Sequence, residues 1–164
     1  MSKNYQIYFD VCCLNRPFDR QTQARISLET EAILEIINYC QEETWTLITS
    51  NVLEAEINQT PNPERVENVH MILSIAKIKV LSGDWLQPRA SELQKLGFAS
   101  YDAAHIASAE RAKADIFLTT DDRLVRKSHT YAPLLKVKVN NPLQWLAQIM
   151  PILENNHENP KPNY

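Results

Sequence analysis

The chain has 164 residues, 44% of them hydrophobic, which suits the core of one ordinary domain. Its formal net charge is -3 and its isoelectric point lies near 5.8, so a polyanionic partner would require a local basic patch or bound metal ions. The three cysteines form no C-x-x-C motif, which favours a reduced, cytoplasmic setting. No apolar stretch approaches the ~20 residues of a membrane span. We therefore expect one domain over residues 1–153, a flexible tail over 154–164 and no membrane association.

The first half of the chain alternates apolar runs with amphipathic segments. Strands are expected at residues 6–9 and 44–49, and helices at 28–40 and 51–59. The first strand ends at Asp10, which either caps the following turn or lies at the carboxyl end of the strand, and the sequence alone leaves both readings open. Ser50 can cap the helix that follows the second strand.

Two glutamates lie on the helix predicted after the second strand. Glu54 and Glu56 are two positions apart, about 200° around a helix, so they point to different sides. Glu56 is flanked by Leu53 and Ile57, apolar residues that should face inward, which places it nearer the buried side. We favour Glu56 as the site residue, with Glu54 as the alternative.

The second half of the chain continues the alternation. Helices are expected over residues 63–76 and 84–96, from residue 100, after residue 122 and from residue 142, and strands over 77–81, 116–118 and 136–139. Gly97 is a natural helix terminator. The repeated strand and helix order predicts an α/β fold with a mainly parallel central sheet and helices on both faces.

Residues 100–128 carry the remaining acids of interest. Asp102 lies in the first turn of a helix, where an acid is often only a partner of the helix dipole, worth about 0.3 to 1 kcal/mol. Asp121 and Asp122 follow a short apolar strand, so one can cap the next helix while the other faces the crevice. His105 lies one turn after Asp102, and such a histidine is more often packed or hydrogen-bonded than catalytic.

Four acids can reach the edge of a parallel sheet where the strands end, the usual location of ligand sites: Asp10, Glu56, Asp102 and Asp121. Carboxylates gathered there would repel by about 4 kcal/mol per close pair at an effective dielectric of about 20, and a divalent cation would compensate that repulsion. Oxygen ligands without a cysteine or histidine cluster favour Mg²⁺ or Mn²⁺ over zinc. Such metals commonly bind phosphates and activate water.

Three segments of the sequence resemble the PIN domain family, which includes the VapC toxins of bacterial toxin–antitoxin pairs: YFDVCCLNRPFD, TSNVLEAEI and SYDAAHIASAERAKADIFLTTDDRLVRK. The resemblance covers residues 5–145, and its most specific part is the Asp-Ala-x-His-Ile-Ala helix followed by a strand and Thr-x-Asp. It implies a PIN-like three-layer fold. It also implies that four acids occupy the metal-binding positions of the family: Asp10, Glu56, Asp102 and Asp121.

By this resemblance the expected activity is hydrolysis of RNA phosphodiester bonds with Mg²⁺ or Mn²⁺ held by the acids and water as the nucleophile. The resemblance also implies a cognate antitoxin protein as partner and a homodimer as one assembly. One alternative is a catalytically inactive PIN scaffold that binds RNA or a protein partner. Another is a metal-dependent phosphatase on a different α/β fold, which the order of the acids does not favour.

Two further features bear on this expectation. Many PIN domains carry Ser or Thr directly after the first Asp, whereas this chain has Val11. Either Asn15 or water replaces the missing hydroxyl, or metal binding is weaker. Four basic residues near the predicted crevice could meet an RNA backbone or could form solvated helix faces: Arg16, Arg123, Arg126 and Lys127.

Overall fold

The computed structural model describes residues 3–157 of the chain, with a central sheet of five parallel strands in the order β3-β2-β1-β4-β5. The strands are β1 (Gln6–Phe9), β2 (Thr46–Ser50), β3 (Ile78–Val80), β4 (Ile116–Leu118) and β5 (Val139–Asn140). In register, Ile7 of β1 lies between Leu47 of β2 and Ile116 of β4. Every pairing is parallel, so the carboxyl ends of all five strands lie along one edge.

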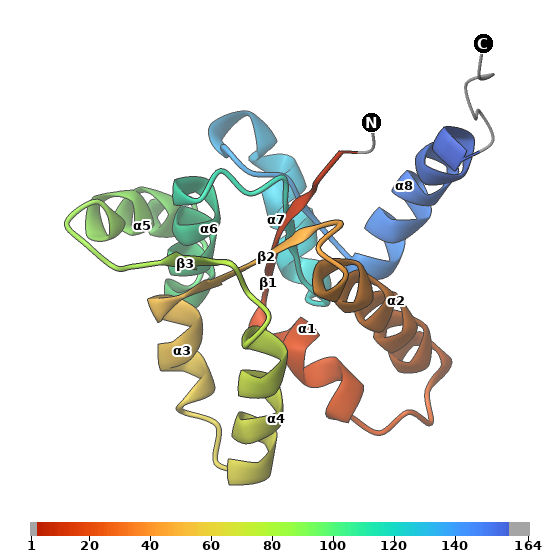
Figure 1. Ribbon diagram of the computed structural model, residues 1–164. Helices are drawn as coiled ribbons and strands as arrows, with labels where there is room; N and C mark the ends of the chain where they lie inside the picture. The colour runs from red at the N-terminus through yellow and green to blue at the C-terminus, as the bar shows by residue number, and fades with distance from the viewer. Residues whose placement is uncertain (1–2, 158–164) are drawn as a thin grey trace.

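Helices cover both faces of the sheet, so the predicted three-layer α/β architecture is confirmed. Figure 1 shows α2 and α8 on one side and α3, α5 and α6 on the other. The helices of the described chain are α1 (Val11–Asn15), α2 (Ala24–Gln41), α3 (Asn51–Ile57), α4 (Pro63–Leu73), α5 (Leu86–Lys95), α6 (Ser100–Arg111), α7 (Asp122–Thr130) and α8 (Pro142–His157), with short 3-10 turns η1 (Arg16–Phe18) and η2 (Ala132–Leu134).

The sheet is buried on both sides, which explains why its strands are runs of apolar residues rather than alternating patterns. Ile7, Tyr8 and Phe9 of β1 have no exposed surface. On one face, small side chains of α6 such as Ala103 and Ala107 are buried and let its backbone approach the strands closely. The central strand β1 is therefore held rigidly, together with the residue that follows it.

Local signals in the sequence set several element boundaries. The Ser50 hydroxyl accepts a hydrogen bond from the backbone N–H of Leu53 at 3.0 Å, so the predicted cap of α3 is confirmed. Gly97 follows α5 with a φ of +102°, a conformation that side-chain-bearing residues rarely adopt, so the predicted terminator is confirmed as well.

The last helix runs further than the sequence pattern suggested. Helix α8 continues through residues 154–157, which lie in the predicted tail, and Pro151 lies inside it. A helix already anchored by packing of Trp145 and Ile149 can continue through polar residues, because each added residue gains a hydrogen bond without a new nucleation cost. The rest of the predicted tail, residues 158–164, lies outside the described residues. Within residues 3–157 no helix is both long and apolar enough to cross a membrane.

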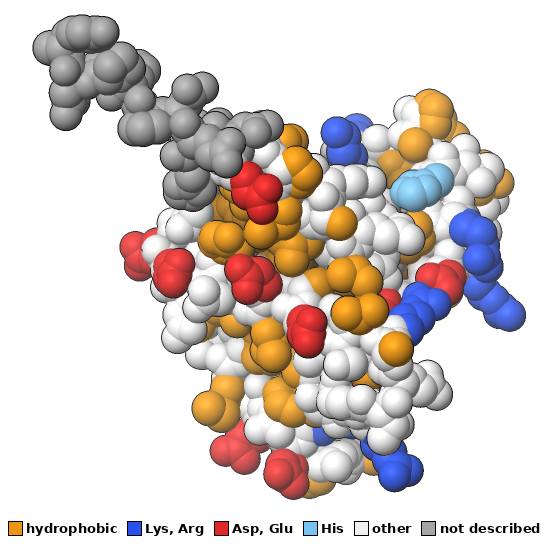
Figure 2. Space-filling view, turned by 90° about the vertical axis from the view of Figure 1, so that its right-hand side faces the viewer, with side chains coloured by type: hydrophobic (Ala, Val, Ile, Leu, Met, Phe, Trp, Pro, Cys, Tyr) orange, Lys and Arg blue, Asp and Glu red, His pale blue; other side chains and the backbone are white. Residues whose placement is uncertain are grey.

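The outer face formed by α2 and α8 carries apolar side chains among acidic ones (Figure 2). Leu28 and Leu34 of α2 and Ile152 of α8 are about half exposed. The sequence pattern alone does not show that these residues are exposed, because α2 also carries apolar side chains on its buried side. This face lies on the opposite side of the sheet from α6.

Candidate metal centre

The four predicted site residues come from elements that end or begin at the carboxyl edge of the sheet. Asp10 directly follows β1, and Asp121 lies just beyond β4, the neighbouring strand. Glu56 is on α3, which begins where β2 ends. Asp102 is in the first turn of α6, a helix that contacts α3.

Asp10 is nearly buried, with 7% of its surface exposed. Its Oδ1 accepts a hydrogen bond from the N–H of Val11 at 2.8 Å, and its Oδ2 accepts one from the Thr119 hydroxyl at 2.8 Å. Burial raises the pKa of this carboxyl well above its usual range, and the charges of Cys12 and, to a smaller extent, Asp102 raise it further. The charge of His105 and the hydrogen bond from Thr119 act in the opposite direction. Asp10 is thus a buried carboxylate whose charge calls for a nearby cation.

Thr119 provides the hydroxyl that Val11 lacks. The sequence left Asn15, water or weaker metal binding as alternatives, but within residues 3–157 the hydroxyl that donates to Asp10 comes from Thr119, just after β4. Residues 10 and 119 meet because β1 and β4 are paired in the sheet, a relation that a local motif does not contain.

Glu56, rather than Glu54, belongs to the acid cluster. Ligand atoms of Asp10, Glu56 and His105 all lie within 4.8 Å of one another. Glu54 instead forms an ion pair with Lys79 of β3 at 2.8 Å, on the other side of the short helix. The positions agree with the 200° separation expected for residues two apart on a helix.

Asp102, in the first turn of α6, lies outside the group of ligand atoms formed by Asp10, Glu56 and His105, but its charge acts on Asp10. Partial burial raises the pKa of the Asp102 carboxyl, and the charges of Asp121 and Glu56 raise it further, whereas His105 and Lys127 act in the opposite direction. The acids Asp121 and Glu56 are therefore close enough to Asp102 for their charges to act on its carboxyl.

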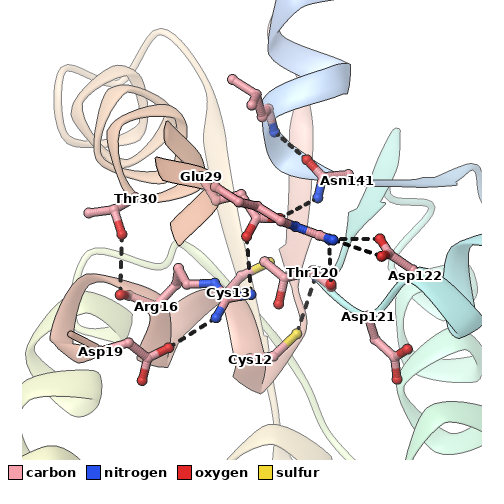
Figure 3. Close-up of polar contacts among 12 residues, drawn as sticks. Cys12, Cys13, Arg16, Asp19, Glu29, Thr30, Thr120, Asp121, Asp122 and Asn141 are labelled. Carbon is pink, nitrogen blue, oxygen red and sulfur yellow. Dashed lines mark hydrogen bonds and ion pairs between the residues drawn. The ribbon is translucent and has the colours of Figure 1, made fainter. Parts of the chain in front are cut away.

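The neighbouring acids Asp121 and Asp122 have different partners (Figure 3). Asp121 caps α7, because its Oδ1 accepts hydrogen bonds from the backbone N–H groups of Arg123 at 3.0 Å and Leu124 at 3.3 Å. Both terminal nitrogens of Arg25 donate hydrogen bonds to the Asp122 carboxylate, at 2.7 and 2.8 Å. This pairing lowers the pKa of the Asp122 carboxyl. One residue, Asp121, thus both caps the helix and adds its charge to the site of Asp102.

Glu29 is a buried acid that sequence reasoning missed. It has 1% of its side chain exposed and forms ion pairs with Arg16 at 3.1 Å and Arg25 at 3.4 Å. Its Oε2 also accepts a hydrogen bond from the Asn141 amide at 2.6 Å (Figure 3). Position 29 lies four and seven residues before the buried Ile33 and Ile36, so the helical spacing of α2 could have marked Glu29 as an acid on the apolar face. Glu29 thus joins α2 to η1 and to the start of α8.

A pocket of about 490 Å³ adjoins Asp121 and is bordered by four arginines: Arg16, Arg25, Arg123 and Arg126. Arg16 and Arg25 are engaged by Glu29, whereas no ion pair within residues 3–157 involves Arg123 or Arg126. Lys127, for which the sequence left an RNA contact and a solvated helix face open, donates a hydrogen bond to the carbonyl of Gly97. The guanidinium groups available to a polyanion are thus those of Arg123 and Arg126.

The donor set suits a hard divalent cation. The ligand atoms within 4.8 Å of one another are carboxylate oxygens of Asp10 and Glu56 and a nitrogen of His105. Carboxylate oxygens are ligands that Mg²⁺ and Mn²⁺ accept. The raised pKa values of Asp10 and Asp102 reflect burial and mutual repulsion that bound positive charge would relieve. The residues present therefore fit a bound divalent cation.

The raised pKa values predict opposite effects of pH on the metal-free and metal-bound protein. Between the unfolded carboxyl pKa of about 4 and the raised native pKa, the native state binds more protons, so the free energy of unfolding of the metal-free protein falls as pH rises. Metal competes with these protons, so the increase in Tm on adding Mn²⁺ should grow from about pH 5 to about pH 8. Thermal unfolding with Mn²⁺ or EDTA measures this. An increase in Tm that is equal at both pH values would contradict the prediction.

No protein-family model matches the chain, and no curated protein matches it in sequence. Solved structures do share its fold. One is VapBC2 from Rickettsia felis bound to a DNA fragment from their promoter, with a TM-score of 0.54 and 11% sequence identity, covering 83% of this chain and 98% of that chain. The likeness shows that this chain has the PIN-like three-layer α/β fold.

Proposed function

We propose that this protein is a Mg²⁺- or Mn²⁺-dependent endoribonuclease and the toxin of a type II toxin–antitoxin pair. One observation carries the proposal: the nearly buried Asp10 carboxylate lies within 4.8 Å of a Glu56 oxygen, at the edge of a parallel sheet where Asp102 and Asp121 add further negative charge. A fold that merely had to be stable would gain nothing from concentrating acids there. Similarity to VapC toxins in sequence motifs and fold supports the nuclease over other metal-binding roles.

In this proposal each residue has a defined task. Asp10, Glu56, Asp102 and Asp121 would hold the cation, and Thr119 would keep the Asp10 carboxylate oriented through its hydroxyl hydrogen bond. A bound divalent cation supplies stabilisation of the charge that develops on a phosphoryl group and promotes ionisation of water. Arg123 and Arg126 would bind the RNA backbone beside Asp121 and align the phosphodiester with the acids.

The proposed partners follow from the same function. A ribonuclease that acts on cellular RNA would be cytoplasmic and would need an antitoxin protein to cover its crevice, and homodimerisation is a further proposal. The VapBC2 structure is a two-protein assembly, which supports the search for an antitoxin. Co-expression with the product of the adjacent reading frame should yield a complex on size-exclusion chromatography and should suppress both cleavage and growth arrest.

Incubation of the purified protein with single-stranded and structured RNAs, with Mn²⁺ or with EDTA, tests the catalytic proposal. Cleavage that requires metal supports it. RNA binding without cleavage in Mn²⁺ would favour the alternative, an inactive PIN scaffold. Cleavage that persists in EDTA would rule out the metal mechanism.

Replacing Arg126 by Ala should weaken RNA binding at every sequence tested. Loss of one phosphate contact reduces the slope of log affinity against log salt by about 0.7 for a single strand. Fluorescence anisotropy across a salt series measures this with the Asp10→Asn variant, so that the RNA stays intact. Lys138→Ala is the matched control. Lys138 is exposed and directly precedes β5, at the edge where the strands begin, whereas the acids lie at the edge where the strands end. Equal salt slopes for the two variants would argue against a phosphate contact by Arg126.

A further inference from the structure

A continuous line of buried hydrogen bonds runs from the start of α3 to Glu56. The Ser50 hydroxyl lies 2.7 Å from the Tyr8 hydroxyl, which lies 2.8 Å from Nδ1 of His105. Nε2 of His105 lies 3.1 Å from Oε1 of Glu56. Ser50, Tyr8 and His105 have no exposed surface, so water cannot supply alternative partners to these groups.

One arrangement of hydrogens satisfies every group in this line. The Leu53 N–H donates to Ser50 at 3.0 Å, so the Ser50 hydroxyl can donate onward to Tyr8. Tyr8 can then donate to Nδ1 of His105, which leaves the hydrogen of the imidazole on Nε2, pointing at the Glu56 carboxylate. All donors point the same way, an arrangement in which each bond polarises and strengthens the next.

The other arrangements each leave a conflict. With hydrogen on Nδ1 alone, the Nε2 lone pair would face a carboxylate oxygen at 3.1 Å, and two acceptors would repel. With hydrogen on both nitrogens, Tyr8 would accept from His105 and donate to Ser50. The Ser50 hydroxyl hydrogen would then have no acceptor among the hydrogen bonds found within residues 3–157. An unsatisfied hydroxyl at a fully buried position is costly.

We propose that His105 is a positioning residue, held by Tyr8 and Ser50 in the Nε2–H tautomer so that it orients the Glu56 carboxylate for the metal. The proposal rests on the proposed function, in which Glu56 is a metal ligand. It assigns His105 a donor role and so excludes it as a nitrogen ligand, although its Nε2 lies close enough to the acids to bind a metal. Removing a residue that hydrogen-bonds to a metal ligand commonly weakens metal binding by about 10- to 100-fold.

The geometry explains why Glu56 needs this support. Helix α3 has only seven residues, and the Glu56 side chain is about a quarter exposed, so packing alone leaves its rotamer free. His105 belongs to the longer helix α6, and Tyr8 belongs to the central strand β1. The line of hydrogen bonds thus ties the Glu56 side chain to the longer helix α6 and to the central strand β1.

Long-range proton–nitrogen correlation spectra of the metal-free protein, recorded above neutral pH, test the tautomer directly. The expected result is hydrogen on Nε2 of His105 and none on Nδ1, unchanged when Mg²⁺ is added. Hydrogen on Nδ1, or loss of hydrogen from Nε2 on adding Mg²⁺, would overturn the proposal. His105→Leu identifies the resonances, since the other histidines remain.

Two substitutions separate the two nitrogens of His105. The amide nitrogen of Gln reaches the place of Nε2, so His105→Gln should retain most of the Mn²⁺ affinity measured by calorimetry. Asn reaches only the place of Nδ1, so His105→Asn should lose about 10- to 100-fold. Equal Mn²⁺ affinity of the Asn variant and the wild type, both folded by circular dichroism, would show that His105 does not position Glu56.

Tyr8→Phe provides a second test, because it removes only the donor to Nδ1. It should weaken Mn²⁺ binding by about 10-fold and allow the Nδ1–H tautomer to appear. Tyr101→Phe is the matched control. The Tyr101 ring stacks on His105 with centroids 6.1 Å apart, but its hydroxyl accepts a hydrogen bond from Gln59 rather than contacting Nδ1. The Mn²⁺ affinity and the tautomer of His105 should therefore stay as in the wild type.

These readouts keep the two proposals distinct. If the wild type neither binds Mn²⁺ nor cleaves RNA, the proposed function fails. If the wild type binds Mn²⁺ and cleaves RNA but carries hydrogen on Nδ1 of His105, the function stands and the positioning role fails.

Discussion

Replacing Asp10 by Asn is expected to reduce metal-dependent RNA cleavage by about a thousandfold or more, since loss of several kcal/mol of charge stabilisation corresponds to that factor. Asn keeps the size of the side chain, and its oxygen can still accept from the Val11 N–H. The metal-free variant should be folded and no less stable than the wild type, because it no longer buries a charge among other acids.

Single-turnover cleavage in Mn²⁺ and thermal unfolding in EDTA measure the two effects of Asp10→Asn. The increase in Tm that Mn²⁺ gives the wild type should disappear in the variant. Asp84→Asn is a suitable control, because Asp84 is exposed in the loop before α5. If Asp10→Asn cleaved RNA at the rate of the wild type, the carboxylate cluster would not be the active site.

Glu29→Ala is expected to destabilise the protein by about 3 kcal/mol, the lower end of the roughly 3 to 5 kcal/mol for breaking a buried ion pair. The lower end applies because Arg16 and Arg25 are partly exposed, so water can solvate the charges left behind. The Asn141 amide, which donates to Glu29 at 2.6 Å, also loses its acceptor.

Urea denaturation in EDTA measures this loss without any contribution from metal binding. Glu31→Ala is the matched control, because position 31 is an exposed glutamate on the same helix and should change stability by less than about 0.5 kcal/mol. If both variants lost the same stability, the effect would come from α2 itself and not from the ion pairs of Glu29.

Most of the architecture could be predicted from the sequence because it rests on local patterns. Short apolar runs and helical periodicity located the strands and the parallel α/β order, and cap residues such as Ser50 and Gly97 marked the ends of elements. The choice of Glu56 over Glu54 also used only helical geometry, and the structure places Glu56 with Asp10. Glu56 could be chosen over Glu54 because the apolar residues that mark the buried side lie within one turn of it on the same helix.

The contacts that sequence reasoning missed join distant parts of the chain. Arg25 and Asp122 are 97 positions apart, so the local sequence does not show that Asp122, rather than Asp121, pairs with Arg25. Thr119 reaches Asp10 only because β1 and β4 are neighbours in the sheet. His105 was weighed as a packed or hydrogen-bonded residue, but its partners Tyr8 and Glu56 lie on other elements. Such partners follow from topology, which periodicity does not specify.

The hydrogen bond between Thr119 and Asp10 spans 109 positions, which has a consequence for the synthesis of the protein. A ribosome completes Asp10 and Glu56 early, but Asp102, Thr119 and Asp121 emerge only in the last part of translation. Until β4 pairs with β1, Asp121 is not in place beside the site, and Asp10 lacks the hydrogen bond from the Thr119 hydroxyl. The acid cluster can therefore assemble only after most of the chain has been synthesised.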